Sequence, residues 1–324
     1  GVPLAKHVGG QIYRGIITGL NEAFVIDSKR RNELIAEDPK SIELIKPFLR
    51  GKDVKRWKVN HNDLYLITFP FGFNDKLDKF PAILKHLTAF EEKLKMRGQC
   101  TSSRTGKGEG QHHWLELDNN PKPEYLDSFA GKKVLMPAIE RQTAFVVDQG
   151  HYSNDKTNIC VTDEPEFLCA ILNSQVTWWQ ITQIAATKQN GYYEFKPLYI
   201  RQISIPSASE SDKARLRELS DSCSVAAVKN DTASLHNLES EINRIVYRLF
   251  DLKASEIAQI EEAVGAPVLT GTHGHTKEKD ALFRRLRSFG LEVPYFSLAK
   301  VTDNPELSEL TAKKELLREY LSEA

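Results

Sequence analysis

Paired cysteines are absent from this sequence, and with them the zinc and redox motifs that depend on CxxC spacing. The four cysteines stand apart, at Cys100, Cys160, Cys169 and Cys223, so we expect reduced thiols in a cytoplasmic protein. No run of about 18 apolar residues occurs, which excludes a membrane-spanning helix and predicts no membrane partner. Residues 1–10 show no signal-peptide pattern and no initiator methionine, and we expect a piece of a longer protein.

Motifs for nucleotide or methyl-donor binding are also missing. No glycine-rich loop leads from a strand into a helix, and the strings nearest to an NPPY-type methyltransferase motif, at 120–123 and 304–307, do not match. No GxSxG elbow is present, and the histidines at 112–113 and 273–275 lack partners at metal-ligand spacing. We therefore expect no catalytic site, metal or cofactor in this chain, while an enzyme with a site invisible in the sequence stays open as an alternative.

The net charge is zero, from 44 basic and 44 acidic side chains, but the two signs are unevenly distributed. Residues 1–110 carry an excess of lysine and arginine, and residues 111–324 carry an excess of aspartate and glutamate. Such an asymmetry is typical of a protein that offers one face to a polyanion, and it also occurs without any nucleic-acid partner. Charge alone does not decide between the two.

The hydrophobic pattern changes near residue 206 and predicts a mixed α/β class. Before this point we expect a strand, a turn and a strand over 11–27, helices over 80–97 and 166–184, and strands at 133–137, 144–148 and 198–205. After it we expect amphipathic helices at 211–229, 231–252, 255–264, 277–288 and 305–322. The predicted parts are an α/β domain (1–206), a helical hairpin (207–265) and a helical C-terminal tail of unassigned role (266–324).

Polar and basic side chains gather in stretches that we expect to be loops, where a scaffold can present them. Lysine and arginine bind phosphates, while arginine, asparagine, glutamine and glutamate can read base edges. The candidate DNA-binding residues of this kind are Lys52, Lys55, Arg56, Ser103, Arg104, Lys107, Glu140, Arg141, Gln142, Lys188, Asn190, Tyr192 and Lys196. A solvated surface is the alternative for each group, and core packing is an alternative for the tyrosine.

Several strings, in a fixed order along the chain, resemble one known family. They are YRGIITGLNEAF (13–24), DPKS (38–41), KPFLRGKDVKRW (46–57), WLEL (114–117), KVLMP (133–137), LCAILNS (168–174) and EFKPLYI (194–200). They are similar to segments of the TaqI-like C-terminal specificity domain, which ends type IIG restriction–modification enzymes and related adenine-N6 DNA methyltransferases. The run at 238–250 resembles the helix that closes such domains, so the resemblance covers about residues 8–262 and leaves out 266–324.

The resemblance implies that residues 1–206 form a target recognition domain for a short double-stranded DNA sequence, read mainly from the major groove. Glu140 and Arg141 lie in a segment similar to the base-reading region of related enzymes, and the opening string adds Arg14, Thr18 and Asn21 to the DNA-binding candidates. In this family the domain follows a methyltransferase domain that binds S-adenosylmethionine, and the target adenine is flipped into it.

Double-stranded DNA and an N-terminal methyltransferase domain are therefore the expected partners, and S-adenosylmethionine is expected in that other domain. The main alternative is a specificity or interaction subunit of a type I-like restriction system or a phage-defence methyltransferase. In that case the helices after residue 206 would bind a partner chain.

Overall fold

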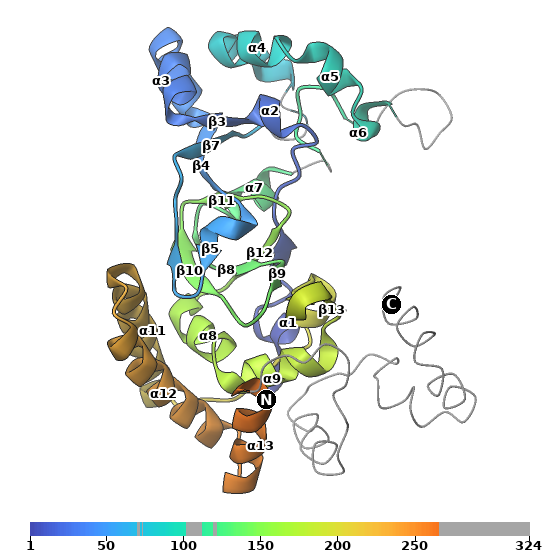
Figure 1. Ribbon diagram of the computed structural model, residues 1–324. Coiled ribbons are helices and arrows are strands. Elements are labelled where there is room, and N and C mark those ends of the chain that lie inside the picture. The colour runs from blue at the N-terminus through green and yellow to red at the C-terminus, as the bar shows by residue number, and fades with distance from the viewer. Residues whose placement is uncertain (70–71, 73, 102–111, 119–121, 266–324) are drawn as a thin grey trace, which may run out of the picture.

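The structure, a computed structural model, describes residues 1–69, 72, 74–101, 112–118 and 122–265. Figure 1 shows these residues as an elongated stack, with helices at both ends and strands between them. Helices α3 (Ser28–Glu37) and α4 (Pro81–Thr88) lie at one end, and α11 (Glu210–Lys229) and α12 (Thr232–Leu249) flank the other. The mixed α/β class is confirmed; the helices predicted at 277–288 and 305–322 lie outside the described residues.

The end that carries α3 and α4 is built on the four-stranded sheet β11-β4-β7-β3. Its strands are β11 (Tyr152–Ser153), β4 (Ile45–Leu49), β7 (Leu64–Ile67) and β3 (Val25–Asp27). The short helices of this end are α2 (Asn21–Phe24), α5 (Glu91–Lys95), α6 (Gly98–Thr101), η1 (Pro39–Glu43) and η3 (Asn74–Lys79). Asp27 accepts the backbone N–H of Arg30 at 2.7 Å, and this cap begins α3 directly after β3.

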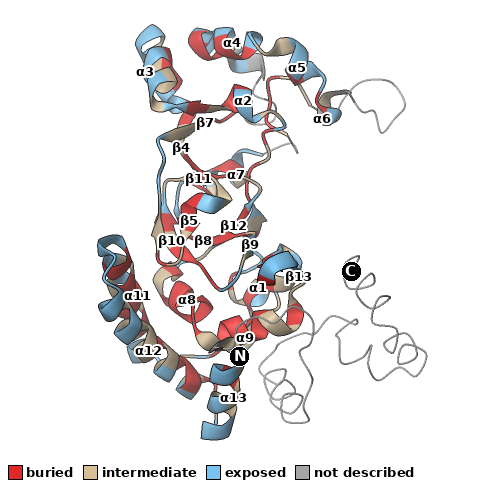
Figure 2. Ribbon diagram, in the orientation of Figure 1, coloured by how far each residue is buried: buried red, intermediate tan, exposed pale blue. Residues whose placement is uncertain are grey.

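The middle of the molecule is the antiparallel sheet β10-β8-β12-β2. Its strands are β10 (Val146–Gln149), β8 (Lys132–Pro137), β12 (Thr157–Val161) and β2 (Ile12–Arg14). Side chains alternate between the two faces of a sheet. Val134 and Met136 belong to one hydrophobic core and Leu135 belongs to the other, so the central sheet is buried on both faces (Figure 2).

The helices after residue 206 pack onto the core on one face of the central sheet. The elements involved are α8 (Pro165–Leu172), α9 (Gln175–Ile184) and α13 (Ala254–Gly265), with α11 against α8 and α13 against α9. Leu216, Ile242 and Ile260 share this core with Val134 of the central sheet. The helical hairpin is thus continuous with the central sheet through one core, and the domain bounds themselves stay a prediction.

Smaller elements complete the described fold. The small strands are β13 (Thr187–Lys188), β14 (Tyr192–Glu194), β9 (Ile139–Glu140), β5 (Val54–Lys55), β6 (Lys58–Val59), β1 (Val2–Pro3) and β15 (Ser204–Ile205). The remaining helical turns are α1 (Leu4–His7), α7 (Pro123–Asp127), α10 (Pro197–Ile200), η2 (Gly51–Asp53) and η4 (Gln189–Gly191). No helix among the described residues combines the length and the apolar character that a membrane crossing requires.

Several predicted elements differ from the structure. The helix expected over 166–184 is two helices, because Ser174 caps a new helix by accepting the backbone N–H of Thr177. The helix expected over 80–97 is likewise divided into α4 and α5, and the turn expected within 11–27 contains α2. The strand expected over 198–205 is wrong in its first half: Pro197 begins α10, because its fixed φ suits a first helical turn.

Candidate nucleic-acid interface

Two groups of candidate DNA-binding residues that are far apart in the sequence meet in the sheet β13-β14-β9. Glu140 of β9 faces Tyr193 of β14, and Lys188 of β13 faces Tyr192 on the other edge of β14. We call these three strands, together with residues 141–142 that follow β9, the small sheet. In Figure 1, β9 and β13 lie on one side of the molecule and α11 and α12 lie on the other.

The surface of the small sheet carries side chains that can read bases. Arg141 and Gln142 are exposed, and the Arg141 guanidinium lies 4.7 Å from the centre of the Tyr192 ring. This cation–π contact restricts the arginine without consuming its N–H donors. Asn190 is exposed in a tight turn with a φ of 62°, a left-handed conformation that asparagine adopts more readily than most residues. Guanidinium and amide groups therefore project from one small area.

A buried carboxylate organises two of the candidate lysines. Glu194 forms ion pairs with Lys196 at 2.8 Å and with Lys188 at 3.2 Å, and its own side chain is almost covered. Burial alone would raise the pKa of Glu194, but the hydrogen bonds and charges of Lys196 and Lys188 outweigh it and hold that pKa below its ordinary value. Glu194 therefore stays ionised and holds two cations beside β14.

A basic pocket borders the small sheet. Arg14, Lys122 and Arg201 come from three separate segments and line one pocket of about 450 Å³, together with Asp118 and Pro197. Arg14 forms an ion pair with Asp155 at 3.0 Å, so part of the charge of Arg14 is balanced. Because Pro197 directly follows Lys196, the pocket extends the cationic surface away from β14. Three cations around one hollow form the kind of surface that attracts phosphate.

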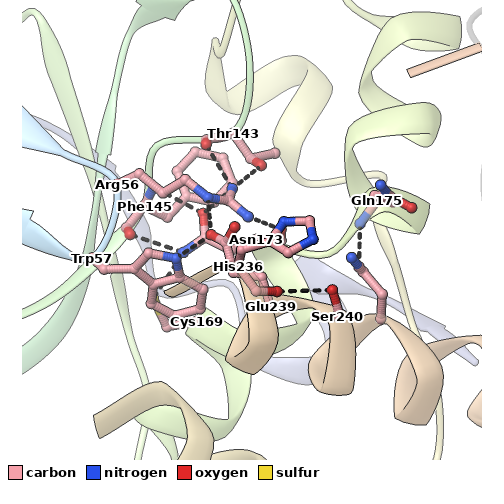
Figure 3. A network of polar contacts seen from close by, with 11 residues as sticks. Arg56, Trp57, Thr143, Phe145, Cys169, Asn173, Gln175, His236, Glu239 and Ser240 are labelled. Carbon is pink, nitrogen blue, oxygen red and sulfur yellow. Dashed lines mark hydrogen bonds and ion pairs between the residues drawn. The ribbon is translucent and has the colours of Figure 1, made fainter. Parts of the chain in front are cut away.

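The other predicted residues occupy different places. Thr18 is buried, and its hydroxyl donates to the side-chain oxygen of Asn21 at 2.7 Å, so both help to fix the start of α2. Lys52 is exposed and Lys55 is partly exposed, near the β5–β6 hairpin. Arg56 is turned toward the helical hairpin and is held there by protein groups (Figure 3). The predicted residues Ser103, Arg104 and Lys107 lie outside the described residues.

Three contributors to this surface were missed by sequence reasoning. Lys122 precedes α7 and Arg201 follows α10, and neither belongs to a basic cluster in the sequence. Glu194 is not among the predicted DNA-binding residues, although it forms ion pairs with both Lys188 and Lys196. A pairing of β9 with β14 would have identified these groups as neighbours, but no local pattern in the sequence encodes that pairing.

The structure gives no alternative centre for metal chemistry in the part of the chain that it describes. No group of three or more histidine, cysteine, aspartate or glutamate side chains is close enough there to hold a metal ion. The four cysteines are free.

A layered α/β body with a helical hairpin at one end and a cationic, amide-bearing face defines a candidate nucleic-acid recognition domain. Residues 46–205 match the family model of the TaqI-like C-terminal specificity domain. The family resemblance stated from the sequence is thereby confirmed over these residues.

Two relatives extend the comparison. The type II methyltransferase M.PaeR7I of Pseudomonas aeruginosa is 24% identical over 261 residues, which are 78% of this chain and 40% of that protein. The type IIL restriction–modification enzyme MmeI, whose structure was solved in complex with DNA, is similar with a TM-score of 0.61 and 11% identity. That match covers 82% of this chain and 36% of the MmeI chain, and it shows a shared fold. The chain thus spans less than half the length of either relative.

Proposed function

We propose that this chain is the double-stranded DNA recognition module of a restriction–modification methyltransferase. The observation that carries the proposal is the small sheet, where Glu140, Arg141 and Lys188 are brought together with the turn at Asn190. A specificity-domain family match over residues 46–205 and a fold shared with a DNA-bound restriction–modification enzyme support it.

The side chains of this surface fall into two proposed groups: those that read base edges and those that bind phosphates. Arginine pairs with guanine, asparagine and glutamine pair with adenine, and glutamate accepts from cytosine in the major groove. Arg141, Gln142, Asn190 and Glu140 are thus the proposed base readers. The lysines beside Glu194 and the basic pocket would bind phosphates, which fixes the register of the domain on the duplex without reading sequence.

We further propose that the reaction occurs on another domain. That domain would bind S-adenosylmethionine and methylate the N6 atom of an adenine flipped out of the duplex, as in a type IIG enzyme. The residues of this chain would bind and orient the DNA. The rival role, a subunit whose last helices bind a partner chain, is less favoured because α11 and α13 pack on α8 and α9 of the same chain.

The proposed function is tested by selecting DNA duplexes with a randomised centre on the purified chain. We expect enrichment of a defined short sequence and binding that weakens steeply with salt. Replacing Lys122 or Arg201 with glutamine should lower affinity for all duplexes by a similar factor and reduce the slope of log affinity against log salt by about one for each lysine or arginine lost. The control Lys85→Gln removes a surface lysine that pairs with Glu37 at the far end.

No enrichment by the wild-type chain, together with binding that ignores salt, would contradict the proposed function. A salt slope that falls as much in Lys85→Gln as in Lys122→Gln would remove the basic pocket from the interface.

A further inference from the structure

Three consecutive residues connect the β5–β6 hairpin to the helical hairpin. Arg56 and Trp57 both donate to the same carboxylate oxygen of Glu239 on α12, at 2.5 Å from Nε and 2.6 Å from Nε1 (Figure 3). Lys58 donates to the side-chain oxygen of Asn230, in the turn between α11 and α12, at 2.7 Å. The sequence predicts that Arg56 contacts DNA. In the structure, however, the side chains of Arg56, Trp57 and Lys58 are hydrogen-bonded to acceptors of the protein itself.

The Arg56 guanidinium has a second set of partners on the opposite side. Its Nη1 donates to the carbonyl oxygen of Thr143 at 2.8 Å and to the hydroxyl of Thr143 at 2.7 Å. Its Nη2 donates to the carbonyl oxygen of Asn173 at 2.7 Å, at the junction of α8 and α9. All three guanidinium nitrogens therefore bond to protein acceptors, and the planar fork joins α12 to Thr143.

Thr143 is the first buried residue after the exposed residues 139–142 of the small sheet. The segment 138–145 is fixed at its start, where Ala138 accepts the N–H of Phe195 at 2.8 Å. It is fixed at its end by the Asn173 side chain, which accepts the N–H of Phe145 at 3.1 Å and donates to the carbonyl of Phe145 at 2.9 Å. Between these anchors, residues 139–142 are partly or fully exposed. The positions of these two fixed ends therefore determine where the side chains of Glu140 and Arg141 point.

Trp57 shows that the network holds the backbone in an unfavourable state. Its φ is 66°, a left-handed conformation that is uncommon for a bulky residue, and its side chain is buried. Two hydrogen bonds retain it: the backbone N–H donates to Phe145 O at 3.0 Å, and the indole donates to Glu239. Backbone strain of this type persists only where surrounding contacts determine it, and it often accompanies a functional requirement for exact placement.

We propose that Glu239 is a positioning residue for DNA sequence reading. Through Arg56 it fixes Thr143, and through Thr143 it fixes the exposed residues 139–142. The helical hairpin would then contribute to sequence discrimination without touching DNA. This inference rests on the proposed function, because it needs the small sheet to read bases.

The variant Glu239→Gln tests this role, and Glu241→Gln is its matched control. Glu241 lies two positions further along α12 and pairs with Arg215 of α11 at 2.8 Å. The variant Glu241→Gln therefore removes the same charge from the same helix, but at a residue that is not linked to Thr143 through Arg56. Two measurements are made on the whole chain. The first is hydrogen–deuterium exchange of peptides that cover residues 138–146, and the second is selection from duplexes with a randomised centre.

We expect exchange of the 138–146 peptides to rise about tenfold in Glu239→Gln and to stay at the wild-type rate in Glu241→Gln. The affinity ratio between the enriched sequence and a scrambled duplex should fall about tenfold in Glu239→Gln, because a misplaced base reader loses its discrimination. The affinity of Glu239→Gln for the scrambled duplex, and the slope of its log affinity against log salt, should match those of Glu241→Gln, because neither glutamate is proposed to contact DNA phosphates.

Unchanged exchange, or an unchanged affinity ratio in a folded Glu239→Gln protein, would overturn the positioning role while leaving the proposed function in place. Faster exchange across the whole chain would also overturn it, since that result describes a general stabiliser. If the wild-type chain enriches no sequence, the proposed function fails first and the positioning role fails with it.

Discussion

Exchanging Glu140 and Arg141, so that each takes the other's place, changes the DNA sequence that the chain prefers. Glu140 is fixed by the β9–β14 pairing, and Arg141 lies over the Tyr192 ring, so the exchange moves a donor to an acceptor's position and an acceptor to a donor's. A bidentate arginine selects guanine and a carboxylate selects cytosine, with about 1–3 kcal/mol of discrimination for each base contact. The preferred base should change at one or two positions of the selected sequence, with the remaining positions conserved.

The control for this exchange is the pair Lys85 and Glu37, which form an ion pair at 2.7 Å between α4 and α3. Exchanging those two residues preserves the charge and the ion pair at a place remote from the small sheet, so the selected sequence should not change. An identical preferred sequence in wild type and in the Glu140/Arg141 exchange would remove both residues from the set of base readers.

The variant Lys133→Met should strongly lower the free energy of unfolding. Lys133 is fully buried in β8 and forms an ion pair with the buried Asp148 at 2.8 Å, and it also donates to Phe129 O at 2.6 Å. Removing one partner of a buried pair leaves an uncompensated charge, which costs about 3–5 kcal/mol. Urea denaturation measures the loss. The adjacent variant Lys132→Met breaks only a surface pair with Glu166 and should cost about 1 kcal/mol or less.

The effect of Lys133→Met depends on pH. Burial would raise the pKa of Asp148, but hydrogen bonds and charges from His151 and Lys133 outweigh it and hold that pKa below its ordinary value. A lowered carboxyl pKa stabilises the fold at neutral pH, and this contribution is lost as the pH falls through the folded-state pKa. The difference between wild type and Lys133→Met should therefore narrow in acid. Equal losses in Lys132→Met and Lys133→Met, or a difference that widens in acid, would contradict this account of the central sheet.

The parts of the fold that follow from local pattern were predictable. The apolar run of β8 indicates a strand buried on both faces, and the steps of three and four that include Ile242 and Val246 indicate the packed face of α12. Breaks inside apolar stretches were harder to foresee. Asn173 and Ser174 interrupt a continuous hydrophobic pattern, and only the cap of Ser174 on Thr177 shows that a second helix begins there.

The sequence predicted some residues of the candidate site but not how they are arranged, because the arrangement depends on the pairing of strands that are far apart in the chain. The strings around Arg141 and Asn190 were identified, but their meeting required β9 to pair with β14. Arg56 illustrates the opposite case. Its basic neighbourhood indicates a DNA contact, whereas the carboxylate that binds it, Glu239, lies far along the chain and cannot be assigned to it by spacing.

The proposed function requires that DNA binds to the face of the small sheet and not to the helical hairpin. Site-specific photocrosslinking tests it most directly, with p-benzoylphenylalanine placed at Gln142 or at Val228. Gln142 is exposed and follows Arg141 after β9, and Val228 is 68% exposed on α11, a helix that lies on the other side of the molecule from β9 in Figure 1. We expect crosslinks to the selected duplex from position 142 and none from position 228. Crosslinks from 228 without crosslinks from 142 would contradict the account.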